Sequence, residues 1–282
     1  MNANILVSAA ELERLLNEAQ CLVVDCRFEL SDPRKGRGEW LAGHVPGAAY
    51  ANLDDNLSSP VHDHTGRHPL PDPGRFAAWL ASIGWAPGTL LVAYDEGSNA
   101  LAARLWWLMR YFGYSSALLD GGLAAWVASG RPLEAGEPER QARESVSLKG
   151  APQLTVDTAT ILEHLGSGEL QVLDARAGPR FSGDVEPLDS RGGHIPGALN
   201  RPFGSNLEAN GRFKPPGALR EEFAALLGGR PRESVVHSCG SGVTACHNLF
   251  AMELAGLTGS RLYPGSWSEW IRDPDRPIET GA

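Results

Sequence analysis

The chain has 282 residues, a length that suits two domains of ordinary size, each with its own hydrophobic core. Its formal net charge of −9 and isoelectric point near 5.4 argue against nucleic acid or an anionic membrane surface as the main partner. No basic and apolar leader opens the chain, and no run approaches the roughly 18 apolar residues of a membrane span, so we expect a cytoplasmic protein.

The first half of the chain alternates apolar, β-branched runs with amphipathic stretches. This alternation predicts an α/β fold with a mostly parallel sheet flanked by helices. The expected strands lie near residues 21–25, 48–51, 89–94 and 116–119, and the expected helices near residues 8–19, 74–84, 98–112 and 121–129.

The stretch 131–152 is rich in Pro, Gly, Glu and Arg and has little periodicity, which is typical of a connector. It separates an N-terminal domain, residues 1–140, from a C-terminal domain, residues 141–282. Two long irregular loops, 58–74 and 178–192, are the segments best suited to shape a site.

The second half repeats motifs of the first half at an offset of about 145–150 residues, which indicates an internal duplication. Each half should therefore contain the same fold. The repeated blocks are Asp25–Arg27 with Asp174–Arg176, Gly43–Ala48 with Gly193–Ala198, and Trp126 with Trp270.

The most informative local pattern begins with a short apolar strand, 235–238, that leads into Cys239 and then into a helix at 246–255. A thiol at the carboxyl end of a strand faces backbone N–H groups and the positive end of the next helix, which favour a thiolate and hold an anion bound to its sulfur. We therefore expect Cys239 to be a nucleophile rather than a small buried hydrophobic residue. The turn between strand and helix consists of Gly240, Ser241, Gly242, Val243, Thr244 and Ala245.

The remaining cysteines are Cys21, Cys26 and Cys246. Together with Cys239 they form neither a disulfide framework nor a C-x-x-C motif, which indicates a reducing compartment. We expect Cys246 to pack in the core, and a resolving role under oxidation is the alternative.

The duplication separates shared structural features from features of one half. The repeated Asp-x-Arg and His residues, and Trp126 with Trp270, should be structural because both halves carry them. Aligning the strands sets Asp95 of the first half against Cys239 of the second. We therefore expect a non-catalytic N-terminal domain, whose turn at Asp95 and Glu96 repels anions, and a catalytic C-terminal domain.

On these motifs the chain resembles the tandem-domain rhodanese-like sulfurtransferases over essentially its whole length. The repeated blocks, the segment Pro264–Trp270 and above all the loop 239–245 carry the resemblance. It implies two rhodanese domains, of which the second forms a persulfide on Cys239 and passes the sulfur to a thiol, to cyanide or to thioredoxin. It implies no metal or organic cofactor, because the backbone amides of the loop supply the electrostatic stabilisation.

The neutral loop is most similar to that of 3-mercaptopyruvate sulfurtransferases, because thiosulfate enzymes tend to carry Arg and Lys after the cysteine. Arg180 matches the family's substrate arginine and would grip a donor carboxylate as a bidentate fork. A second family arginine is missing from Val185–Leu188, and Arg191 is the expected substitute. Thiosulfate stays open as the alternative donor.

The resemblance also implies a proton relay of Ser241, His68 and Asp54, in which His68 would supply a proton to a pyruvate enolate. The alternative is that His68 only packs in a proline-rich loop. The group of His62, His64 and His68 lacks an acidic or thiol ligand, so we expect no metal site.

Two other functions compete with sulfur transfer. A tyrosine phosphatase also places a cysteine before an amide-lined loop, but it needs an arginine six residues later, where this chain has Ala245. A non-catalytic sulfur-carrier or regulatory module would use the fold only for binding, and its Cys239 would gain no sulfur from a donor.

Overall fold

The computed structural model describes residues 5–281 and divides into two compact units. Unit 1 comprises the described residues up to Ser59, with Leu70–Ala151 and Ala209–Arg212, and unit 2 comprises Pro60–Pro69, Pro152–Glu208 and the described residues from Phe213 onward. The predicted division at 140/141 assigns Pro60–Pro69 to the first domain and Ala209–Arg212 to the second, whereas each of these segments groups with the other unit. Pro60–Pro69, which we call the exchanged segment, precedes the connector and yet folds with unit 2.

Unit 1 contains a five-stranded sheet in which every strand pair is parallel. The predicted parallel sheet with flanking helices is thus confirmed for this half. The strand order is β1 (Leu6–Val7), β5 (Ser116–Leu119), β4 (Leu90–Tyr94), β2 (Cys21–Asp25) and β3 (Ala49–Tyr50), and the helices are α1 (Ala9–Asn17), α2 (Lys35–Ala42), α3 (Pro73–Ser82), α4 (Ala102–Tyr111) and α5 (Gly122–Ala128).

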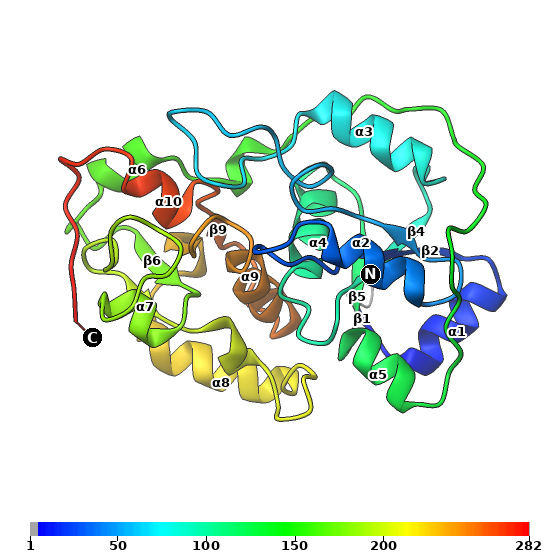
Figure 1. Cartoon of the computed structure of the whole chain (residues 1–282). Helices are drawn as coiled ribbons and strands as arrows, with labels where there is room; N and C mark the ends of the chain where they lie inside the picture. The colour runs from blue at the N-terminus through cyan, green and yellow to red at the C-terminus, as the bar shows by residue number, and fades with distance from the viewer. Residues whose placement is uncertain (1–4, 282) are drawn as a thin grey trace. The chain divides into compact units, whose positions relative to one another are not determined.

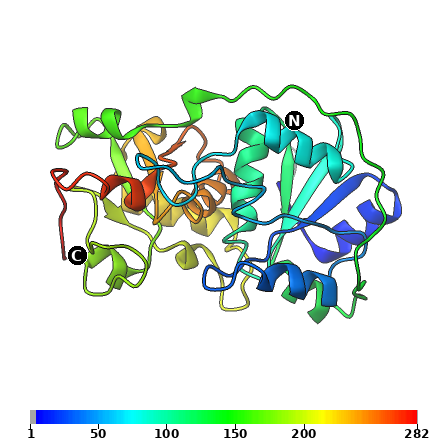
Figure 2. The same ribbon diagram turned by 45° about the horizontal axis from the view of Figure 1, so that its top comes forward.

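Both faces of the unit 1 sheet are covered, which explains why its strands read as continuous apolar runs. Val23, Val92 and Tyr94 pack with side chains of α1 and α5 on one face, and α3 and α4 lie on the other (Figure 2). The side chains of Ser8 and Asp72 each accept a hydrogen bond from the backbone N–H three residues later, which fixes the starts of α1 and α3.

Unit 2 contains a four-stranded parallel sheet with the same kind of cover (Figure 1). Its α6 and α10 contribute to the apolar cluster on one face, whereas α8 and α9 pack against each other on the other. The strand order is β7 (Leu199–Asn200), β6 (Gln171–Asp174), β8 (Val235–Ser238) and β9 (Arg261–Leu262), and the α-helices are α6 (Thr158–Glu163), α7 (Gly178–Ser182), α8 (Pro216–Leu227), α9 (Ala245–Leu254) and α10 (Ser266–Trp270).

The repeated motifs make the same contacts in both units, so their predicted structural role is confirmed. In unit 1 the Arg27 guanidinium bonds the Asp25 carboxylate and the Gly43 carbonyl, each at 2.7 Å. In unit 2 the equivalent bonds measure 2.8 and 2.7 Å. The residues that make them are Arg176, Asp174 and Gly193.

The paired histidines are also structural. His44 and His194 are buried, and each bonds a backbone carbonyl through Nδ1, at 2.7 and 2.8 Å. Trp126 and Trp270 lie in the apolar clusters of their units, as predicted. Every helix among the described residues is too short or too polar to cross a lipid bilayer.

Candidate active site

Cys239 follows β8, an interior strand of the unit 2 sheet, and is 1% exposed. Asp95 occupies the equivalent position after β4 in unit 1. The equivalence follows from the backbone, because the Trp267 N–H donates to the Cys239 carbonyl at 3.0 Å and the Leu123 N–H donates to the Asp95 carbonyl at 2.9 Å. The predicted alignment of carboxylate with thiol is thus confirmed.

The turn after Cys239 depends on Gly242. This residue has a left-handed φ of +74°, and a Cβ atom there would lie 2.3 Å from the carbonyl oxygen of Pro264. Glycine alone meets both demands. The close approach brings the loop against the segment that precedes α10.

Gly240 matters for a different reason, since it is not left-handed. A Cβ atom there would lie 2.9 Å from Nη2 of Arg67 and 3.5 Å from Nη2 of Arg180. Two guanidinium groups therefore stand beside the residue that directly follows the thiol.

The loop presents N–H groups away from α10. The carbonyls of Cys239 and Gly240 accept hydrogen bonds from the N–H groups of Trp267 and Ser268 at 3.0 and 2.9 Å. Because C=O and N–H point in opposite directions across a trans peptide, the N–H groups next in the chain point away from that helix. Within residues 5–281, no acceptor is bonded to the N–H groups of Gly240, Ser241, Val243, Thr244 and Ala245.

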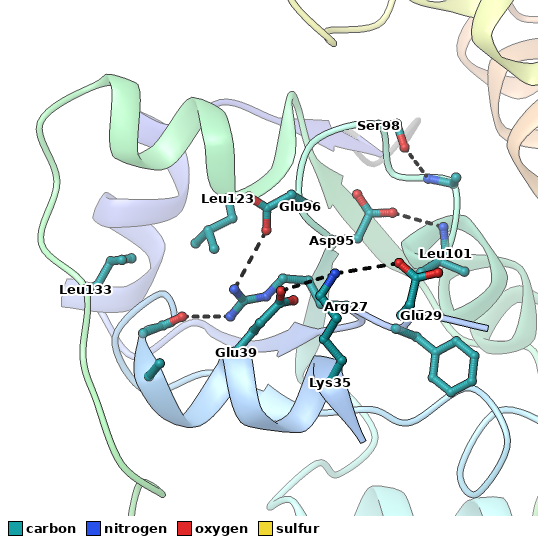
Figure 3. Close-up of a pocket in the computed structure, with 14 residues that line it drawn as sticks. Arg27, Glu29, Lys35, Glu39, Asp95, Glu96, Ser98, Leu101, Leu123 and Leu133 are labelled. Carbon is teal, nitrogen blue, oxygen red and sulfur yellow. Dashed lines mark hydrogen bonds and ion pairs between the residues drawn. The ribbon is translucent and has the colours of Figure 1, made fainter. Parts of the chain in front are cut away.

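The equivalent loop of unit 1 holds a carboxylate. The Asp95 carboxylate accepts hydrogen bonds from the N–H groups of Gly97 and Asn99 at 3.0 and 2.7 Å. It also accepts one from the N–H of Leu101 at 2.9 Å (Figure 3). Burial raises the pKa of Asp95, and these backbone hydrogen bonds oppose the shift. The loop thus holds a carboxylate of its own, and the predicted repulsion of other anions by Asp95 and Glu96 stays a prediction.

The wrapping of the loop around Asp95 also shortens a predicted helix. The helix expected from residue 98 begins at Ala102 as α4, since the residues before it form the turn around the carboxylate. A cavity of about 580 Å³ lies beside this turn, lined by Arg27, Glu96 and Leu123 among others (Figure 3). Unit 1 thus fills its own anion site with the Asp95 carboxylate and keeps a cavity next to it.

The two arginines near Gly240 belong to one charge network. Arg67 Nη1 bonds the Asp189 carboxylate, and Arg180 Nη2 bonds Glu186 at 2.7 Å and Asp189 at 3.3 Å. Burial raises the pKa of Asp189 and the charge of Arg67 opposes it, whereas for Glu186 burial is outweighed by the hydrogen bonds from Arg180 and others, so its pKa is lowered. The carboxylates are 5% exposed and the arginine side chains 27% and 20%. The network holds both guanidinium groups in place while leaving part of each accessible.

Sequence reasoning missed Arg67, although it singled out the neighbouring His68. Arg67 reaches unit 2 through the exchanged segment, which close packing holds: a Cβ atom on Gly66 would lie 2.4 Å from the carbonyl oxygen of Gly265. The Arg67 N–H also donates to Oγ of Ser268 at 3.0 Å. The sequence offered one signal for Arg67, which is its position in the loop 58–74 that we expected to shape a site.

Arg191, the expected second substrate arginine, lies elsewhere in unit 2. Its Nη1 donates to the carbonyl of Pro274 at 3.3 Å, and its own carbonyl accepts from Nε1 of Trp267 at 2.8 Å. Arg67 rather than Arg191 accompanies Arg180 beside Gly240.

The structure brings together two of the three residues of the expected relay. His68 Nδ1 and Ser241 Oγ are hydrogen bonded at 2.7 Å, and both residues are buried. Asp54 belongs to unit 1, where its N–H donates to Oδ1 of Asn52 at 2.9 Å. A relay through Asp54 stays a prediction.

The other candidates have simpler surroundings. Cys246 is buried in α9 and donates from Sγ to the Gly242 carbonyl at 3.4 Å, which fits packing. His62 and His64 are exposed whereas His68 is buried. Among the described residues, no three His, Cys, Asp or Glu side chains are grouped to hold a metal ion.

Comparison with known families and proteins agrees with this geometry. The family model described as rhodanese-like domain matches the chain twice, at residues 8–129 and 157–273. A Pseudomonas aeruginosa protein named "Probable 3-mercaptopyruvate sulfurtransferase" is 49% identical over 286 residues, covering 100% of both chains.

Two further relatives bear on the donor and the fold. A Mycobacterium tuberculosis protein that is provisionally named a thiosulfate sulfurtransferase is 37% identical over 282 residues, covering 98% of this chain and 97% of its own. The crystal structure of SseA, a 3-mercaptopyruvate sulfotransferase from Escherichia coli, superposes with a TM-score of 0.82 at 32% identity, covering 94% of this chain and 100% of that one.

Proposed function

Because both of its units match, the chain belongs to the rhodanese-like domain family, and we propose that it is a 3-mercaptopyruvate sulfurtransferase with Cys239 as its nucleophile. The observation that carries this proposal is the pair of guanidinium groups beside an amide-lined loop that starts at a cysteine. That combination suits a donor with a carboxylate at one end and a transferable sulfur at the other.

In the first half-reaction, the Cys239 thiolate attacks the sulfur of 3-mercaptopyruvate. An S–S bond forms and the C–S bond breaks, and its electron pair stays on carbon as the enolate of pyruvate. Protonation of the enolate gives pyruvate. The persulfide left on Cys239 then loses its outer sulfur to an attacking thiolate or cyanide, which restores the Cys239 thiolate.

The loop amides would stabilise the charge on sulfur during both steps. Those of Gly240 and Ser241 are already oriented by the carbonyl bonds to α10, so little reorganisation accompanies transfer. The unit 1 loop supports this role, since its amides hold the Asp95 carboxylate.

Arg67 and Arg180 would bind the donor carboxylate. Asp189 bonds both guanidinium groups, and no acceptor among the described residues is bonded to Arg67 Nη2 or Arg180 Nη1. A carboxylate that accepts from both would lie close to Gly240 and leave the three-carbon donor extending toward the thiol.

His68 would supply the proton that the enolate needs. Its hydrogen bond to Ser241 holds an imidazole next to the loop where the enolate would form. We assign the role to His68 and Ser241, with Asp54 as the expected third member.

Thiosulfate is the second candidate donor. The guanidinium groups stand at the residue directly after the thiol, where a compact dianion would also profit from them. For the acceptor we propose a small thiol, cyanide or reduced thioredoxin in the cytoplasm, with the N-terminal domain non-catalytic because Asp95 fills its loop.

Steady-state rates with 3-mercaptopyruvate and thiosulfate, side by side, test the donor. We expect a higher kcat/KM with 3-mercaptopyruvate, and a preference for thiosulfate would overturn that choice. Cys239→Ser should abolish turnover with both donors and prevent the added sulfur mass on the protein. Retained turnover in this variant would refute the assignment of the nucleophile.

A further inference from the structure

We propose that Ser266 is a positioning residue for the nucleophile, whose hydroxyl fixes the backbone of Cys239 so that the following amides face the sulfur. The inference rests on the proposed function, because it assigns a task within the same site. Ser266 would touch neither the donor nor the reacting atoms.

The Ser266 hydroxyl is committed to two backbone groups. Its Oγ accepts from the Cys239 N–H at 3.1 Å and donates to the Tyr263 carbonyl at 3.0 Å. Ser266 is fully buried, so water does not compete for either bond. The hydroxyl thereby ties the nucleophile to the segment that leads into α10.

Three consecutive residues at the start of α10 bind the nucleophile and its neighbour. The Ser266 hydroxyl accepts a hydrogen bond from the Cys239 N–H, and the N–H groups of Trp267 and Ser268 donate to the carbonyls of Cys239 and Gly240. These bonds fix the peptide planes on both sides of Cys239 as well as the plane after Gly240. Because each plane is rigid, fixing the carbonyls and the first N–H fixes the direction of the amides that line the loop.

Ser266 makes this bond in a backbone conformation that serine disfavours. Its φ is +52°, and among the described residues only two other non-glycine residues, Ala19 and Asn99, have a positive φ. A left-handed residue with a Cβ atom is strained relative to glycine, and such strain persists where the surrounding structure needs it. The bond to Cys239 supplies that need.

Unit 1 carries glycine at the equivalent position. Since Leu123 and Trp267 make equivalent bonds, Gly122 is the counterpart of Ser266, and its φ is +56°. A Cβ atom on Gly122 would lie 2.5 Å from the Asp95 carbonyl oxygen, so serine does not fit there. Of these two equivalent positions, the strained serine with its hydroxyl thus lies in the unit whose loop begins with a cysteine.

Two variants separate the hydroxyl from the strain. Ser266→Gly and Ser266→Ala both remove the hydroxyl, but only glycine relieves the left-handed strain. We expect both variants to lower kcat by about tenfold or more, with the donor KM within about twofold of wild type. The rate at which iodoacetamide alkylates Cys239 at pH 7, followed on the Cys239 peptide by mass spectrometry, should fall in parallel. The Tm of the alanine variant should lie about 2–4 °C below that of the glycine variant.

A purely structural role predicts a different pattern, in which the rates follow stability and the glycine variant stays close to wild type. Wild-type turnover and alkylation in Ser266→Gly would therefore overturn the proposal. Ser116→Ala is the matched control, because it removes a buried hydroxyl that bonds the Trp106 carbonyl at 3.2 Å in unit 1, and it should lower Tm without slowing alkylation.

The alkylation rate also separates this proposal from the proposed function. A wild-type protein that transfers sulfur from neither donor would refute the function. The comparison of alkylation rates between the glycine variant and wild type would still decide the role of Ser266.

Discussion

Replacing Arg67 with glutamine tests how the donor carboxylate is bound. A hydrogen bond that involves a charged group contributes about 1.5–3 kcal/mol. The Arg67 side chain is 27% exposed and already paired with Asp189, so we expect the lower part of that range, about 1.5–2 kcal/mol. Since each 1.36 kcal/mol is a factor of ten, Arg67→Gln should lower kcat/KM for 3-mercaptopyruvate by roughly 10- to 30-fold, mainly through KM.

The assay compares two donors that differ only at the carboxylate. Mercaptoacetone has the same thiol and ketone as 3-mercaptopyruvate but ends in a methyl group, so its kcat/KM should not change in Arg67→Gln. Arg191→Gln serves as the matched control and should leave both donors unaffected, because its guanidinium bonds the Pro274 carbonyl. Equal losses with both donors, or a loss only in the Arg191 variant, would refute the two-arginine clamp.

Three further predictions concern the loop, the histidine beside it and a core histidine. Gly242→Ala should lower Tm by several degrees more than Gly197→Ala does. Both glycines have a φ of +74°, but a Cβ atom on Gly197 would have no atom within 4 Å, whereas one on Gly242 would meet Pro264. Equal losses of Tm would mean that the close approach to Pro264 is unimportant. His68→Gln should lower kcat with 3-mercaptopyruvate, whose enolate needs a proton, more than with thiosulfate, whose departing sulfite needs none; an equal loss would assign His68 to packing. Burial lowers the pKa of His237 from 6.5 to about 3, so the unfolded state binds more protons than the folded state between these pH values. The free energy of unfolding should therefore fall as the pH drops from about 6.5 toward 3. The His237→Gln variant should show a flatter pH profile of stability, and an unchanged profile would contradict this.

The sequence predicted what depends on local pattern. Strand, cysteine, glycine turn and helix are contiguous in the chain, so the loop after Cys239 could be read directly from residue order. The duplication then supplied the alignment of Asp95 with Cys239, and the backbone bonds of both units agree with it.

The sequence did not predict what depends on long-range contacts. Arg67 is 173 residues from Gly240, and its arrival beside that glycine follows from the packing of Gly66 on Gly265, which no local pattern reveals. The hydrogen bonds that the Asp95 carboxylate accepts from its own loop were not predicted, because charge alone does not tell whether a carboxylate points outward or toward backbone N–H groups. The positive φ of Ser266 could not be predicted from the sequence either, since it depends on the hydrogen bonds that hold the residue in the folded structure.

The exchanged segment bears on why a half without the loop cysteine is present in the chain. Arg67 and His68 are encoded before the connector but serve the loop that follows it. A stand-alone copy of the later half, cut at the connector, would retain Cys239 but would lack the guanidinium of Arg67 and the imidazole of His68. Truncation of the gene to the later repeat would thus remove two side chains that lie against its loop, which gives selection a reason to preserve both repeats.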